Sequence, residues 1–196
     1  FNRIEMIVIP DSSNPLAMLR TGDVDIAFAL SAAELNRAEK ARGVKVLSIP
    51  DRQKLNVGLN VRPGGAFENV TLRQALAYAV PYDDIVYGVL KDRAAKSAGP
   101  MSVNSRFFGL YNLADMPSYY TDLDKAKELL QEAGHGDGFA FELITAKGVP
   151  HVEQSAASLK ASFAKIGVDM TITPVSQATM AEKNGQGTYD AFMRDW

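Results

Sequence analysis

The sequence predicts an α/β fold. In the first part of the chain, three short apolar runs typical of strands alternate with helical patterns. The last part repeats this alternation, with a helical pattern before each of its last two strand patterns. Hydrophobic residues make up 46% and charged residues 22% of the 196 residues, an ordinary balance for a globular protein. Such an order of elements favours parallel strand pairing.

The composition narrows the class of protein. A net charge of -2 argues against a nucleic-acid-binding surface, which usually carries a basic excess. No apolar run approaches the roughly 18 residues of a membrane helix. The absence of cysteine excludes a cysteine nucleophile, a disulfide and a thiolate metal site. Because the chain begins at Phe1 rather than Met, we expect a processed or trimmed piece of a longer protein.

The first part of the chain is expected to form strands at 3–9, 24–30 and 44–49. Two helices are expected between these strands: one over 15–21, with Pro15 at its first position and Ser13 or Asn14 as the cap, and one capped by Ser31 that runs to about Arg42. A glycine follows each helix, as is typical of a helix C-terminus.

The middle of the chain contains a strand followed by a pair of helices. Polar or small residues alternate with apolar ones at 55–61, which predicts a strand and a boundary between two parts. Apolar residues at three- and four-residue steps predict a helix over 70–80. Proline lacks an N–H and disfavours helical geometry in the preceding residue, so this helix should end near Val80 and a second one should begin at Pro81.

The stretch 98–118 has no clear period and predicts a long loop, which is either functional or docked on the surface. Thr121 is expected to cap the next helix, with Asp124 completing a capping box and Gly134 ending the helix. The remaining elements are expected as a strand at 139–145, a helix at 152–166, a strand at 168–173, a helix at 177–184 and a strand at 189–193.

The two histidines are the first candidates for chemistry. A metal site would require His135 and His151 to converge with a carboxylate such as Asp137 or Glu153; the alternative is two plain loop histidines. The composition leaves a serine–histidine–aspartate triad open, but no Gly-x-Ser-x-Gly elbow is present. No Walker motif is present either.

Aromatic side chains around the long loop are the second candidates, since they can either line a ligand pocket or anchor the loop. They are Phe107, Phe108, Tyr111, Tyr119 and Tyr120. The single tryptophan, Trp196, follows the last predicted strand, where packing is its commoner role.

The stretch from Phe67 to Val86 reads F-x-N-V-x-L-R-Q-A-L-A-Y-A-x-x-x-D-x-I-V. It resembles the signature of the extracellular solute-binding proteins of the oligopeptide and dipeptide class, the receptors of ABC importers. Pro81 and Tyr82 depart from the usual Asp-Arg or Asn-Lys. Further segments resemble the family in the right order, namely 19–27, 56–61, 120–134, 164–168 and 189–196.

This resemblance implies a periplasmic-binding-protein-like architecture with two lobes that close on a ligand by hinge bending. Residues 1–54 would form the C-terminal part of the first lobe, 55–62 a hinge strand, and 63–196 the N-terminal part of the second lobe. Family members are much longer, so the chain would be an internal piece of such a protein.

The resemblance also implies a function. The protein would be a periplasmic or extracellular monomer, lipid-anchored in some relatives, that delivers peptides or another small solute to the membrane permease of an ABC importer. It would catalyse no reaction and need no cofactor or metal. Two alternatives remain: a hydrolase that uses the loop histidines and acids, and a ligand sensor on the same fold.

The family suggests where ligand contacts would fall: Phe28, Leu30 and Ser31 from the first lobe, and Lys147, Arg194 and Trp196 from the second. Lys147 stands near the place where some dipeptide-binding members have a carboxylate-binding arginine. A solvated lysine is the alternative, and lysine binds a carboxylate less rigidly than arginine does. Family members also carry nickel chelates, glutathione, sugars and opines, so the ligand stays open.

Overall fold

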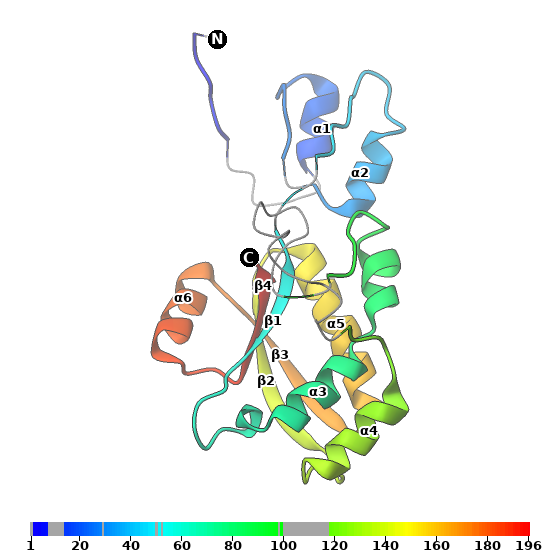
Figure 1. Ribbon diagram of the computed structural model, residues 1–196. Helices are drawn as coiled ribbons and strands as arrows, with labels where there is room; N and C mark the ends of the chain where they lie inside the picture. The colour runs from blue at the N-terminus through cyan, green and yellow to red at the C-terminus, as the bar shows by residue number, and fades with distance from the viewer. Residues whose placement is uncertain are drawn as a thin grey trace. The chain divides into compact units, whose positions relative to one another are not determined.

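A computed structural model describes residues 2–7, 14–28, 30–49, 51, 53–97, 99 and 118–196 (Figure 1). The chain divides into two compact units, unit 1 (Phe1–Ile49) and unit 2 (Pro50–Trp196). The predicted long loop, including Phe107, Phe108 and Tyr111, lies almost entirely outside the described residues. Within the described ranges, no helix is both long and apolar enough to cross a membrane. The assignment of lobes and of a hinge stays a prediction.

Unit 1 contains two helices, α1 (Asn14–Thr21) and α2 (Ala32–Ala38). Ser31 caps α2 as predicted: its hydroxyl accepts the Glu34 N–H, and the Glu34 carboxylate accepts the Ser31 N–H. This reciprocal arrangement satisfies two donors that a helix N-terminus otherwise leaves unpaired. The helix ends at Ala38, earlier than expected.

The three strands predicted for unit 1 do not form in its described residues. The runs at 3–9, 24–30 and 44–49 have no regular secondary structure there, while residues 8, 9 and 29 lie outside the description. Many of their large apolar side chains are exposed, with Met6 at 87% and Ile49 at 83%. A strand is stabilised by hydrogen bonds to a neighbouring strand, and none of the described backbone hydrogen bonds joins these runs. Alternation indicates strand tendency but does not show that a partner exists.

Unit 2 is built on a four-stranded sheet in the order β1-β4-β2-β3. Strand β2 pairs in parallel with both β3 and β4, and β1 pairs antiparallel with β4. The predicted α/β fold is therefore confirmed for this unit, whereas the parallel pairing predicted from the first part of the chain does not form in the described residues of unit 1. The strands are β1 (Leu55–Leu59), β2 (Phe139–Ala146), β3 (Val168–Val175) and β4 (Ala191–Asp195).

Helices cover both faces of this sheet. Residues of α3, α4 and α5 form the main core with one face, while Met180 of α6 packs with Ile144 on the other. Figure 1 shows α6 on one side of the sheet and α3 and α5 on the other. The helices of unit 2 are, in chain order, the 3-10 helix η1 (Ala66–Glu68), α3 (Val70–Ala79), the π-helix η2 (Asp84–Val89), α4 (Leu123–Glu132), α5 (Pro150–Ala164) and α6 (Gln177–Gln186).

Two features that follow α3 differ from the prediction, namely the type of the next helix and the residue that caps α4. Helix η2 is a π-helix, in which the Leu90 N–H donates to the Ile85 carbonyl five residues back. Asp122, not Thr121, caps α4, so the predicted capping box is wrong. Thr121 instead donates to the Val80 carbonyl at 2.6 Å and accepts the Tyr82 N–H at 3.2 Å. A bond to the corner after α3 across the fold competes with a local cap, which the sequence pattern does not reveal.

Gly138 gives the first test of the packing. It has a φ of +86°, and a Cβ atom there would lie 2.1 Å from the Gly167 carbonyl oxygen, a backbone atom that cannot move aside easily. We expect Gly138→Ala to lower the free energy of unfolding by about 3 kcal/mol, measured by urea denaturation. Gly185→Ala is the matched control because that glycine lies in α6 with open space around it; it should be neutral or slightly stabilising. Equal effects of the two substitutions would contradict this account.

Tyr82 gives a test that depends on pH. Burial, together with the neighbouring Tyr119, raises the pKa of Tyr82 to about 12, and its hydroxyl donates to the Ala77 carbonyl at 3.1 Å. The folded protein keeps this proton above the pH at which an unfolded tyrosine, with a pKa near 10, loses it. The stability that the protonated Tyr82 hydroxyl adds to the folded state is therefore complete below about pH 10 and is lost as the pH rises toward 12.

We expect Tyr82→Phe to show a smaller fall in melting temperature than the parent protein between about pH 9.5 and 11.5. Tyr87→Phe is the control, because the Tyr87 side chain is 60% exposed. If the melting temperature of Tyr82→Phe falls as much as that of the parent over this pH range, the Tyr82 hydroxyl contributes nothing to the pH dependence of stability.

Candidate functional site

The carboxyl ends of β2, β3 and β4 lie at one edge of the unit 2 sheet because the three strands are parallel. The chain leaves β2 through α5 to reach β3, then crosses through α6 on the opposite face to reach β4 on the other side of β2. Open α/β sheets bind ligands outside the carboxyl ends of the strands where the connections change direction in this way. We name the edge between the ends of β2 and β4 the switch-point edge.

The pairing between β2 and β4 ends before the strands do. The β2–β4 register stops at Thr145–Met193, whereas the β2–β3 register continues to Ala146–Val175. Beyond Met193, β4 remains joined to the β1 side, where the Trp196 N–H donates to the Lys54 carbonyl at 2.9 Å. The described β2–β4 register therefore stops two residues before the end of β4, and the described backbone bonds of Trp196 run to Lys54.

Arg194 and Trp196 form a pair at the end of β4. The guanidinium carbon of Arg194 lies 4.7 Å from the centre of the Trp196 ring, and the tryptophan is 72% exposed. The Arg194 Nε–H donates to the Asp195 carbonyl at 3.2 Å. Such a cation–π pair presents a positive charge and an apolar ring face next to each other.

Two lysines add positive charge at this edge. Lys147 follows β2 directly; its backbone N–H donates to the Val175 carbonyl at 2.9 Å, and its side chain is exposed. Lys54 precedes β1, and its ammonium group donates to the Gly99 carbonyl. Burial lowers the pKa of Lys54 from its ordinary value. Sequence reasoning missed Lys54, although its place directly before the predicted strand at 55–61 was a usable signal.

His151 and Asp195 meet at the same edge. The His151 Nε2 atom lies 2.8 Å from Asp195 Oδ2. Ser155 lies one turn further along α5, but it is fully buried and its hydroxyl makes no hydrogen bond to the imidazole. A nucleophile must reach both the base and the substrate, so these three residues do not form a catalytic triad. Among the described residues, no three His, Asp or Glu side chains gather in a way that could hold a metal ion.

A family model described as bacterial extracellular solute-binding proteins, family 5 Middle, matches residues 1–196. The chain belongs to this family. As predicted, its fold is the α/β fold of periplasmic binding proteins.

Similarity to individual solute-binding proteins supports this family assignment. The chain is 26% identical over its whole length to the probable D,D-dipeptide-binding periplasmic protein DdpA of Escherichia coli, of which it covers 37%. It is also 26% identical over its whole length to heme-binding protein A of Haemophilus influenzae and covers 36% of it. The structure of DppA from Helicobacter pylori in complex with the peptide STSA matches with a TM-score of 0.86 and 28% identity, over 96% of this chain and 35% of that one. The chain thus spans well under half the length of these relatives.

The predicted contact residues fall into two sets. Lys147, Arg194 and Trp196 all lie at the switch-point edge of unit 2. Phe28, Leu30 and Ser31 lie close together in the sequence before α2 of unit 1, where Phe28 is exposed and the Ser31 hydroxyl bonds to Glu34. The role of all six residues as ligand contacts stays a prediction.

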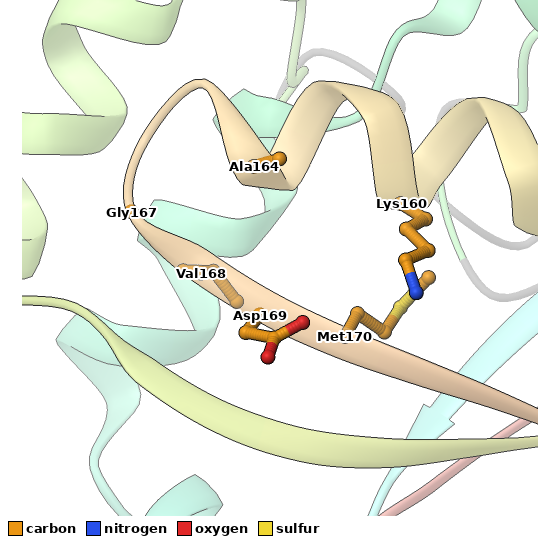
Figure 2. Close-up of a pocket in the computed structure, with 6 residues that line it drawn as sticks. All are labelled: Lys160, Ala164, Gly167, Val168, Asp169 and Met170. Carbon is orange, nitrogen blue, oxygen red and sulfur yellow. The ribbon is translucent and has the colours of Figure 1, made fainter.

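A second surface feature is a shallow groove between the end of α5 and the start of β3, with a volume of about 320 Å³. Figure 2 shows the Lys160 side chain reaching from α5 toward Met170. The groove lies at the amino end of β3, away from the switch-point edge, so it serves below as a control surface. Its lining residues are Lys160, Ala164, Gly167, Val168, Asp169 and Met170.

Proposed function

We propose that this chain forms part of the solute-binding component of an ABC importer and that it binds a peptide or a related small solute at the switch-point edge. The protein would act outside the cytoplasm as a monomer, pass its ligand to a membrane permease, and make or break no bond. Closure of two lobes around the ligand is part of this proposal, with Phe28, Leu30 and Ser31 as contacts from the first lobe. The relatives named for dipeptide binding and for a bound peptide support the ligand class.

The observation that carries the proposal is the Arg194–Trp196 pair at the end of β4. The exposed ring offers a flat apolar surface for a side chain or a peptide plane, while the guanidinium offers a charge for a carboxylate. Lys147, at the end of β2, provides a second cation on the other side of the switch point. Peptides combine apolar side chains with a terminal carboxylate, so this chemistry suits them.

Calorimetry of the intact protein with STSA and with a D,D-dipeptide tests the proposal. We expect binding of at least one of these probes, and we expect Arg194→Ala and Trp196→Ala each to weaken it by roughly tenfold. Lys160→Ala, which removes a cation from the groove at the other end of β3 (Figure 2), is the control and should leave the affinity unchanged. The proposal fails if neither probe binds, or if the Lys160 change weakens binding while the Arg194 and Trp196 changes do not.

A further inference from the structure

The His151–Asp195 hydrogen bond connects two elements that the sheet leaves unconnected at this edge. His151 is the second residue of α5, Asp195 is the last residue of β4, and 44 positions separate them in the sequence. The two side chains are 34% and 29% exposed, so solvent only partly competes with the bond.

The end of β4 lies beyond the described register with β2, so the His151–Asp195 bond supplies a contact to its α5 side. Past Met193, the described backbone bonds of β4 run to the β1 side, including both bonds between Trp196 and Lys54. On the α5 side, the His151–Asp195 bond at 2.8 Å is a side-chain contact that lies beyond the end of the β2–β4 ladder. Its loss would leave the last residues of β4 free to move away from α5.

The side-chain alternation of β4 explains how His151 acts on the binding residues. Ala191 and Met193 face the core that contains α5, and Asp195 continues that face. Arg194 and Trp196 therefore stand on the opposite face and do not meet His151 directly. Any influence of His151 on them passes through the backbone of β4.

We propose that His151 is a positioning residue: it fixes the Asp195 carboxylate and thereby holds Arg194 and Trp196 in place at the switch-point edge. The expected effect on ligand binding rests on the proposed function, whereas the positioning of β4 does not. The dipole of α5 favours the Asp195 carboxylate near the helix N-terminus. A neutral imidazole that donates its Nε2–H is sufficient for the bond. A glutamine amide can therefore replace it.

The test compares His151→Leu with His151→Gln in the intact protein, using hydrogen exchange of the segment 190–196 without ligand. We expect His151→Leu to speed exchange of the Trp196 amide by roughly tenfold and His151→Gln to restore slow exchange. His135→Leu, at the chain's other histidine, is the control and should leave this segment unchanged. Should His151→Leu fail to fold, Asp195→Ala removes the same bond from the other partner.

The binding of STSA is measured on the same variants. We expect His151→Leu to weaken it by roughly tenfold and His151→Gln to stay within about twofold of the parent. Unchanged exchange in His151→Leu, or unchanged affinity despite faster exchange, would overturn the positioning role. If the parent protein binds only the D,D-dipeptide, that probe replaces STSA; if it binds neither, that result counts against the proposed function, and the exchange measurement still supports or overturns the positioning of β4.

Discussion

The parallel pairing of β2 with a strand on each side is the constraint on which the rest of unit 2 depends. Because β3 and β4 both run parallel to β2, each must be reached by a crossover, and the two crossovers occupy opposite faces of the sheet. This arrangement places three carboxyl ends at one edge and makes the chain change direction between β2 and β4. The position of Lys147, Arg194 and Trp196 follows from this topology.

The same pairing explains why the edge needs support. The β2–β4 ladder is short and ends at Met193, so Arg194 and Trp196, which the proposal uses for binding, lie beyond its end. Lys54 holds Trp196 from the β1 side through two backbone bonds, and His151 holds Asp195 from the α5 side. A binding surface on a strand end is precise only when neighbouring elements fix it.

Local signals in the sequence were sufficient for most helices and for the unit 2 strands. Gly22 and Gly134 end their helices with φ near +82° and +83°, a backbone geometry that glycine adopts without cost. Alternation predicted the strand that became β1, and Pro81 predicted the end of α3. The resemblance to the solute-binding family pointed to Lys147, Arg194 and Trp196, and the topology places them at one edge.

What the sequence did not reveal depends on residues far apart along the chain. The unit 1 runs have strand patterns but no strand partner in the described residues, so Ile4 and Phe28 remain exposed. Asp122 caps α4 in place of Thr121, because the Thr121 hydroxyl donates to the Val80 carbonyl. The His151–Asp195 bond joins a helix start to a strand end, and no spacing rule connects these positions. Such pairings appear only once the topology is known.

A crystal structure of the intact protein with STSA bound tests the central claim most directly. We predict peptide atoms within about 4 Å of the Trp196 ring or the Arg194 guanidinium, at the carboxyl ends of β2 and β4. A peptide seated in the groove of Lys160 and Met170, or anywhere else that leaves the switch-point edge empty, would contradict the account.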